Sequence, residues 1–313
     1  MVLKQVIEIY EMLDNPEIKE SEMKEYFITK GLNNSEIETK KIKEKKEETV
    51  FIKIYVKGKR GKLKRGTAPT LGIIGRLGGV GARPHKIGLV SDADGAITAL
   101  AAAAKLITMR KKGDELKGDV IVTTHLCSHS PIIPHEPVPF MGAPVSMETM
   151  NKYEVDNRMD AILSIDTTKG NRIINHKGFA ISPTVKDGYI LRVSEDLLDI
   201  MQTVTGKMPV VFPITTQDIT PYGNEIYHLN SIMQPATATR APVVGIAITT
   251  EVPVPGCATG ANHGLDIESA ARFVIETAKA WGEGKCSFYD EREFQRLTSL
   301  YGSLEHLKTL GME

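Results

Sequence analysis

Four side chains of the types that bind metal ions come after apolar stretches of the sequence. They are Asp92, His125, Asp166 and His263. Two carboxylates and two imidazoles suit zinc, and they also suit manganese or cobalt. In a parallel sheet the carboxyl ends of the strands meet along one edge, which is where α/β proteins build their sites. The four positions therefore predict a divalent-metal site, with zinc as the first choice, if the stretches before them belong to one sheet.

A further carboxylate, Asp94, lies two residues after Asp92, at the start of an alanine-rich stretch. An aspartate at a helix start accepts hydrogen bonds from backbone N–H groups that have no partner within the helix. This capping role explains Asp94. Asp92 is therefore the favoured functional carboxylate.

The segments around these residues alternate between strand and helix. The alanine-rich stretch Gly95–Lys112 predicts a helix that lies close against a sheet, and Asp266–Trp281 predicts another. The alternation predicts a three-layer α/β/α sandwich with a mostly parallel central sheet. Short apolar runs predict its strands at Leu71–Gly75, Ile87–Ser91, Asp119–Thr124, Asp160–Asp166 and Val243–Thr250.

The first 48 residues have a different character. Val2–Asp14 and Ser21–Gly31 have the spacing and end residues of helices. Ile37–Glu48 is a run of Lys and Glu, which predicts a solvated helix face or a mobile connector. We expect an N-terminal helical and charged segment over 1–48 and a single α/β domain over 49–313.

Two polar loops supply candidate substrate-binding residues. The glycine-rich loop RLGGVGARP contains Arg76 and Arg83, whose guanidinium groups could hold a substrate carboxylate. The loop QDITPYGNEIYHLN contains Asp218 and His228, which could line a substrate pocket. Structural ion pairs and Asx turns explain the same residues equally well, so both interpretations stay open.

Glu251 and His129 are the candidates for a general base. Glu251 follows the last predicted strand, and His129 lies in HLCSHSPIIPHEPVPF, a loop stiffened by its prolines. A stiff loop with several histidines is a plausible wall of a site. For His129, an ordinary surface position is the simpler alternative.

Composition excludes several classes of protein. Lys+Arg and Asp+Glu both count 39 in 313 residues, so nothing global indicates nucleic acid or an anionic membrane as a partner. The three cysteines have no CxxC spacing, which favours a reducing compartment over a disulfide framework. The N-terminal stretch carries acidic residues and does not look like a signal peptide. We expect a cytoplasmic protein.

The order of these features resembles that of the zinc-dependent exopeptidase superfamily, whose aminopeptidases, carboxypeptidases and deacylases have a phosphorylase/hydrolase-like α/β/α fold. In that group a metal-bridging Asp precedes a helix with small residues, and SDADGAITALAAAAKL is similar, with Asp92 in the bridging place. Asp166 matches a metal-binding Asp after a later strand, and His263 matches a His before the last helix. The resemblance implies a metal-dependent, aminopeptidase-like hydrolase of a small amide or peptide that forms homo-oligomers.

Two features of the superfamily are absent. Its next strand ends in two glutamates, a base and a ligand, whereas here that strand ends in Thr124 and His125. Its early His-x-Asp ligand is missing too, and His85 is the nearby candidate. The blocks DTTKGN, QDITPYGN and GCATGANH look more like an uncharacterised bacterial and archaeal family, a numbered domain of unknown function.

Two alternatives to the metal-dependent hydrolase stay open. One is a non-catalytic binding or assembly protein on the same fold. The other is nucleophilic catalysis by Cys257 with His263 as its base. A small buried residue is the simpler explanation of Cys257.

Overall fold

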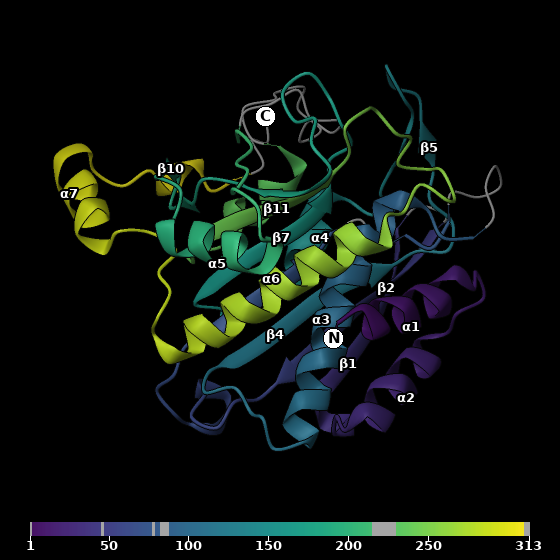
Figure 1. Ribbon diagram of the computed structural model, residues 1–313, viewed down its shortest axis with the longest axis horizontal. Helices are drawn as coiled ribbons and strands as arrows, with labels where there is room; N and C mark the ends of the chain where they lie inside the picture. The colour runs from purple at the N-terminus through teal and green to yellow at the C-terminus, as the bar shows by residue number, and fades with distance from the viewer. Residues whose placement is uncertain (1, 45–46, 77–78, 82–87, 215–229, 310–313) are drawn as a thin grey trace.

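The computed structural model describes residues 2–44, 47–76, 79–81, 88–214 and 230–309. Its centre is a nine-stranded mixed sheet with the order β1-β2-β4-β3-β7-β11-β9-β10, in which β8 also pairs with β11 (Figure 1). A separate two-stranded sheet joins β5 (Ile132–Ile133) to β6 (Phe140–Met141). Among the helices that the structure describes, none has the length and apolar character needed to cross a bilayer.

The middle of the sheet is parallel. β3 lies between β4 and β7, so that Gly75 is level with Thr124 on one side and with Ile165 on the other. All residues of these strands are buried, as expected of near-continuous apolar runs that are covered on both faces. The parallel strands are β3 (Thr70–Gly75), β4 (Asp119–Leu126), β7 (Ala161–Thr167) and β11 (Val243–Thr249).

Antiparallel strands flank this core. β2 (Glu47–Val56) pairs with β4, and β1 (Ile37–Glu44) pairs with β2 at the edge of the sheet. At the other side the strands are β8 (Gly178–Ile181), β9 (Val185–Lys186) and β10 (Tyr189–Ile190).

The prediction of a solvated helix face or mobile connector over 37–48 was wrong over its described part, because β1 occupies residues 37–44 and β2 begins at residue 47. Ile37 is buried and pairs with Ile54, while Lys41 forms an ion pair of 3.3 Å with Glu48 on the neighbouring strand. Charged side chains on an edge strand discourage pairing with other chains. The run of Lys and Glu therefore reflects an edge position.

Helices cover both faces of the sheet. On one face α1 and α2 pack against α3, and α6 packs between α3 and α5; on the other face lie α4 and the 3₁₀ helix η4 (Figure 1). This arrangement confirms the predicted α/β/α architecture. The α-helices are α1 (Leu3–Asp14), α2 (Glu20–Lys30), α3 (Asp94–Lys111), α4 (Met147–Glu154), α5 (Glu195–Thr205), α6 (Gly264–Glu283) and the protruding α7 (Glu291–Tyr301). The 3₁₀ helices are η1 (Asn34–Glu36), η2 (Lys62–Lys64), η3 (Ser91–Ala93), η4 (Ser231–Thr237) and η5 (Glu305–Leu307).

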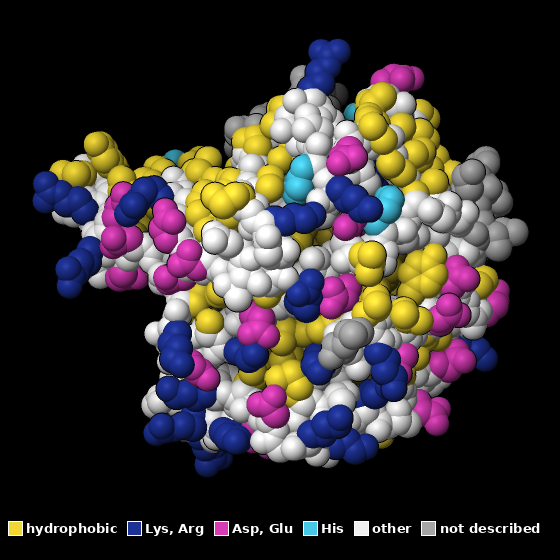
Figure 2. All heavy atoms as spheres, in the orientation of Figure 1, with side chains coloured by type: hydrophobic (Ala, Val, Ile, Leu, Met, Phe, Trp, Pro, Cys, Tyr) yellow, Lys and Arg dark blue, Asp and Glu magenta, His cyan; other side chains and the backbone are white. Residues whose placement is uncertain are grey.

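Cationic and anionic side chains are interspersed over the face that α1, α2, α3 and α6 cover (Figure 2). This mixture matches the equal totals of the two charges in the sequence. A nucleic-acid-binding surface is expected to carry a patch of Lys and Arg side chains. On the face shown, Asp and Glu side chains lie among the Lys and Arg side chains.

The predicted strand Ile87–Ser91 was wrong over its described part. Residues 88–90 form no strand, Ser91 begins η3, and position 87 lies outside the described residues. The backbone N–H groups of Ser91 and Asp92 donate to the carbonyls of Ala258 and Gly256, at 3.3 and 3.0 Å. The loop before α6 thus provides the backbone hydrogen-bond acceptors that a neighbouring strand would provide in a sheet.

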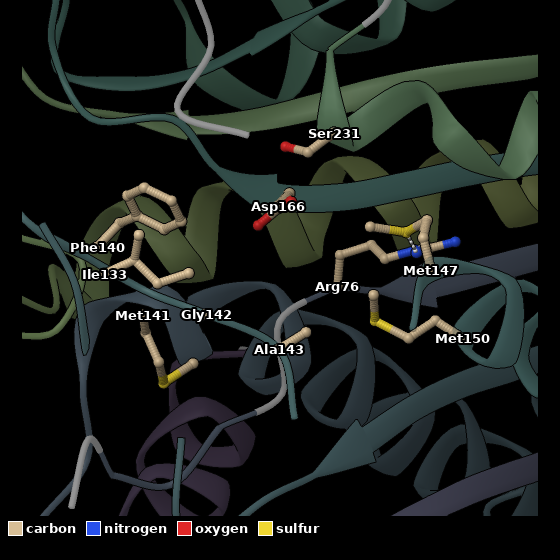
Figure 3. A pocket seen from close by; sticks show the side chains of 10 residues that line it. All are labelled: Arg76, Ile133, Phe140, Met141, Gly142, Ala143, Met147, Met150, Asp166 and Ser231. Carbon is tan, nitrogen blue, oxygen red and sulfur yellow. Dashed lines mark hydrogen bonds between the residues drawn. The ribbon is translucent and has the colours of Figure 1, made fainter. Parts of the chain in front are cut away.

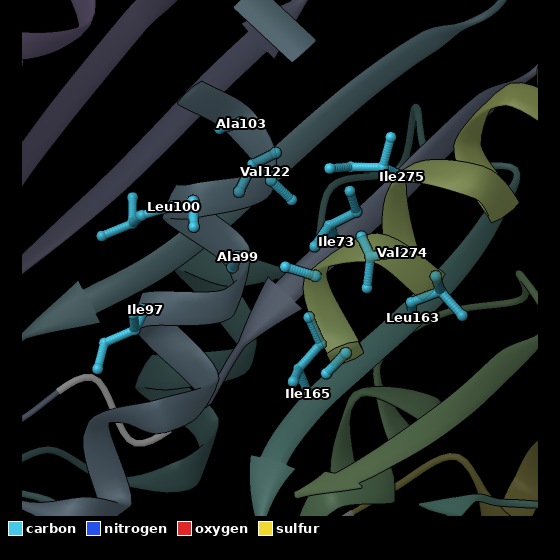
Figure 4. Packing of buried hydrophobic residues seen from close by; sticks show 14 of the residues in the cluster. Ile73, Ile97, Ala99, Leu100, Ala103, Val122, Leu163, Ile165, Val274 and Ile275 are labelled. Carbon is cyan, nitrogen blue, oxygen red and sulfur yellow. The ribbon is translucent and has the colours of Figure 1, made fainter. Parts of the chain in front are cut away.

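The alanine-rich helix α3 lies directly on the parallel strands. Ala99, Leu100 and Ala103 pack with residues of β3, β4, β7 and α6 (Figure 4). At its first turn the approach is closest, because a Cβ added to Gly95 would lie 2.6 Å from the Ile165 carbonyl oxygen and 2.7 Å from that of Arg76. Gly95 therefore lets the start of α3 touch the ends of β7 and β3.

We predict that Gly95→Ala lowers the free energy of unfolding by about 1–3 kcal/mol, because the methyl group must displace strand backbone. Gly264→Ala is the matched control, since Gly264 also lies in the first turn of a helix and an added Cβ would meet nothing within 4 Å. That substitution should be neutral or slightly stabilising. Urea denaturation of both variants measures the difference, and equal effects would contradict the close approach.

Candidate functional site

Three of the predicted site residues lie at the carboxyl edge of three neighbouring strands. Arg76 follows β3, His125 is near the end of β4, and Asp166 is near the end of β7. All three are at least 98 % buried. The Arg76 N–H donates to the Ile165 carbonyl at 2.7 Å, which fixes the exit of β3 against β7.

An apolar pocket of about 60 Å³ lies at this edge, under α4 and η4. Figure 3 shows the Asp166 carboxylate directed toward the side of the pocket that Phe140 and Ile133 form, while the Arg76 guanidinium lies beside Met147. The volume admits a few waters or one small substituent. The lining residues are Arg76, Ile133, Phe140, Met141, Gly142, Ala143, Met147, Met150, Asp166 and Ser231.

A buried ionic network closes one side of this pocket. Glu154 at the end of α4 is fully buried, and its two carboxylate oxygens lie 2.6 Å from His125 Nδ1 and 3.1 Å from Arg76 Nε. Arg76 also donates to Met147 Sδ at 3.0 Å and to the side-chain oxygen of Asn151. A buried carboxylate persists only when charged or polar partners surround it. The network therefore fixes α4 on the ends of β3 and β4.

The sequence interpretation missed Glu154 and Asn151. Both lie in METMNKYE, a short helix whose polar residues look like a solvated face. The available signal was the spacing of Met147, Met150, Asn151 and Glu154, which places them on one side of a helix. That spacing gives no sign that the polar members of the set are buried.

Asp92 lies behind the pocket wall. Its Oδ2 accepts a hydrogen bond of 3.1 Å from the backbone N–H of Met141, which lines the pocket. A Cβ added to Gly256 would lie 2.1 Å from Asp92 Oδ1, so the backbone of the loop before α6 packs directly on the carboxylate. The hydroxyl of Ser91 donates to the carbonyls of Pro255 and Gly256 at 2.9 and 3.0 Å, which holds the loop in place.

The expectation that Asp94 caps a helix was wrong. The N-cap residue of α3 is Ala93, which makes no side-chain capping bond, and Asp94, the first residue of the helix, is completely buried. The side chain of Asn262 donates to Asp94 Oδ1, and the ammonium of Lys169 lies 3.8 Å from Oδ2. Burial raises the pKa of Asp94 to about 7, which outweighs the lowering by Lys169 and Asn262. Asn262 also donates to the Val90 carbonyl at 3.1 Å.

Three sequence blocks therefore meet around one carboxylate. Asp94 comes from SDADG, Lys169 from DTTKGN after β7, and Asn262 from GCATGANH before α6. Contacts between residues this far apart in the sequence could not be read from spacing.

His263 occupies the first position before α6 and is partly exposed. Asp266, in the first turn of that helix, is 92 % buried, since its exposed fraction is 8 %. Burial raises the pKa of the Asp266 carboxyl, and the nearby side chains of Lys177 and His263 oppose this rise. His263 therefore lies close enough to Asp266 to influence the pKa of its carboxyl.

The other predicted site residues divide into two groups. His129 and Glu251 are exposed, and the His129 carbonyl accepts a hydrogen bond of 3.0 Å from the Cys127 thiol. Arg83, Asp218 and His228 lie outside the described residues. The roles assigned to these five residues stay predictions.

Cys257, the alternative nucleophile, is 2 % exposed. This burial agrees with the simpler explanation of Cys257 as a small buried residue.

The described residues do not fit a metal site made of the four predicted ligands. Within the described ranges, no three His, Cys, Asp or Glu side chains are grouped so that they could hold one metal ion. Glu154 lies on His125 Nδ1 and a backbone N–H lies on Asp92 Oδ2, which leaves the second donor atom of each residue out of these two contacts. The misfit therefore rests on the separation of the four side chains.

Residues 40–311 match a protein family described as "Protein of unknown function (DUF1177)". The chain belongs to the DUF1177 family. This membership confirms the expectation of a numbered family of unknown function. No protein of curated function matches the sequence significantly.

Several solved structures are similar to this chain at low identity. An aminopeptidase of Legionella pneumophila, LapA, has a TM-score of 0.44 and 10% identity, over 92% of this chain and 71% of that chain. A mutant of tomato leucine aminopeptidase has a TM-score of 0.45 and 11% identity, over 88% of this chain and 61% of that chain. A glutaminyl cyclase of an Acidobacteriales bacterium has a TM-score of 0.46 and 11% identity, over 90% of this chain and 94% of that chain.

We predict that Glu154→Ala lowers the free energy of unfolding by about 3–5 kcal/mol, because it leaves the Arg76 guanidinium buried without its carboxylate. Glu276→Ala is the control, since it removes a half-exposed ion pair on α6, in which the Glu276 carboxylate lies 2.7 Å from the Lys279 ammonium. Exposed pairs contribute about 1 kcal/mol or less. Chemical denaturation at neutral pH compares the variants, and a small loss for Glu154→Ala would show that the network does not stabilise the fold.

Proposed function

We propose that this member of the DUF1177 family is a hydrolase of a small amide or peptide. One observation carries the proposal: the buried carboxylate of Asp166 lies in the wall of an apolar pocket at the carboxyl edge of the parallel strands. Hydrolysis of an amide requires a group that activates water beside a place for the substrate, and a carboxylate can act as a general base. Sheet edges of this kind are the usual location of such sites.

The pocket walls suggest which part of the substrate enters. Phe140, Met141 and Met150 give it an apolar surface, and its 60 Å³ suit a small apolar substituent more than a long chain. The scissile bond would then lie at the mouth of the pocket, beside Asp166. A substrate with a small apolar side chain next to the amide meets these requirements.

Asp166 is the residue we assign to contact with the reacting part of the substrate. Asp92 supports the opposite wall through its hydrogen bond to Met141. In this proposal Asp166 is the general base, and the base roles of Glu251 and His129 stay predictions from the sequence. Because the described residues do not fit the predicted zinc site, no step of the reaction is assigned to a metal. Self-association of the chain also stays a proposal.

A non-catalytic binding protein on this fold is the second candidate. The observation in its favour is that the described residues form no metal-binding group, while Arg76 and His125 are engaged in a structural network. It predicts that small amides or peptides bind without being cleaved, and that Asp92→Ala leaves their binding intact. Loss of peptide turnover in Asp92→Ala would contradict this reading.

We predict that the protein cleaves aminoacyl-arylamides and dipeptides with a small apolar residue, and that Asp166→Asn lowers kcat/KM by about 10²–10⁴-fold. Asp199→Asn is the control, because Asp199 is exposed on α5. Release of the arylamine measures the rate, and melting curves verify that both variants are folded. Turnover by Asp166→Asn at the parental rate, or no turnover of the whole panel, would refute the proposal.

We further predict that the double variant Asp166→Asn, His263→Ala contains the same amount of zinc, manganese or cobalt per protein molecule as the parent protein. The reason is that the four predicted ligands do not form a metal-holding group within the described residues. Elemental analysis of the purified proteins and melting curves with and without zinc measure this. Loss of bound metal in the double variant would restore the predicted four-ligand site.

A further inference from the structure

A second pocket lies on the other side of α4 from the apolar pocket. It has a volume of about 610 Å³, within the range of about 300–1,000 Å³ that is usual for small-molecule sites. Met147 and Met150 of α4 line the apolar pocket, whereas Glu148 and Lys152 of the same helix line this one. We call it the α4 groove. Its polar lining residues are Glu148, Asn151, Lys152, Asn157, Thr237 and Thr309.

The α4 groove presents two opposite charges that do not neutralise each other. Glu148 and Lys152 are exposed and four residues apart on one helix, a spacing at which side chains often pair. Within the described part of the chain, no ion pair joins them; the Lys152 ammonium lies 5.8 Å from the centroid of the neighbouring Tyr153 ring. One wall thus offers a carboxylate and an ammonium separately.

Uncharged hydrogen-bonding groups complete the groove. The amides of Asn151 and Asn157 and the hydroxyl of Thr237 all line it. A ligand with a single charge would leave Glu148 or Lys152 unmatched. A small molecule that carries both charges and further polar atoms would satisfy the whole set.

We propose that the α4 groove binds a free amino acid, whose ammonium contacts Glu148 and whose carboxylate contacts Lys152. The Asn157 amide and the Thr237 hydroxyl oxygen supply the remaining hydrogen bonds. The site is separate from Asp166 and does not depend on the hydrolase proposal.

Asn151 connects the groove to the apolar pocket. It is 94 % buried, since its exposed fraction is 6 %, and its oxygen accepts a hydrogen bond from Arg76 Nη2. Its amide nitrogen donates to the Thr237 hydroxyl oxygen at 3.4 Å and to the Gln234 carbonyl at 3.5 Å, and the Thr237 hydroxyl donates to the same carbonyl at 2.7 Å. Arg76 in turn donates to Met147 Sδ at 3.0 Å, within the wall of the apolar pocket. An amino acid that contacts Thr237 therefore changes the surroundings of Asn151 and, through it, those of Arg76 and Met147.

Calorimetric titration with glycine and L-alanine tests the site, with acetate and methylammonium as probes of one charge each. We expect both amino acids to bind more tightly than either single-charge probe. Lys152→Met and Glu148→Gln should each weaken binding by roughly tenfold or more, which corresponds to about 1.4 kcal/mol. Lys112→Met is the control, because Lys112 is exposed at the end of α3. Undiminished binding in Lys152→Met, equal binding of acetate, or no binding of glycine would each overturn the proposal.

NMR spectra of ¹³C-methyl methionine report the connection between the pockets. Glycine should shift the signals of Met147 and Met150 in the parent protein, and Glu148→Gln, which adds no methionine, should remove these shifts. Shifts that persist in Glu148→Gln would place the ligand in the apolar pocket and refute the α4 groove. Asp166→Asn should keep glycine binding, so a failure of the hydrolase proposal can be told apart from a failure of this one.

Discussion

The burial of one carboxylate, that of Glu154, determines how the candidate site is built. Such a group is stable in the interior only with partners, and here they come from two strands that end side by side. Arg76, the residue after β3, supplies a guanidinium, and His125 of β4 supplies a ring nitrogen. Because α4 carries Glu154, the helix is fixed over the sheet edge, and its methionines become the wall of the apolar pocket.

A second polar centre determines the opposite wall. Asp94 receives Asn262 from the loop before α6 and lies near Lys169 from the loop after β7. The same loop before α6 packs its backbone on Asp92 through Gly256. Residues 88–93, the described part of the segment before α3, are thus held by side chains and loop backbone and form no strand. Both walls rest on buried polar groups from distant parts of the sequence.

The sequence was sufficient for the layers of the fold but not for the contacts of the site. Apolar runs located β3, β4, β7 and β11 because buried parallel strands are continuous in Val and Ile. Periodicity failed at η3, where a short apolar stretch is held by a loop, and at β1, where edge charges hid a strand. It also gave no warning that Asp94 and Glu154 are buried, since local spacing carries no information about which distant partner will neutralise a carboxylate.

The shortness of α4 has a consequence for the order of folding. A helix of 8 residues is too short to persist alone in water, where about 12–15 residues are needed. Its ties reach across 75 positions to Arg76 and 29 to His125, so the strands must be assembled before the helix has anything to hold it. The native conformation of α4 therefore depends on contacts with the ends of β3 and β4. A change that separates these two strand ends would remove the wall between the two pockets together with the helix.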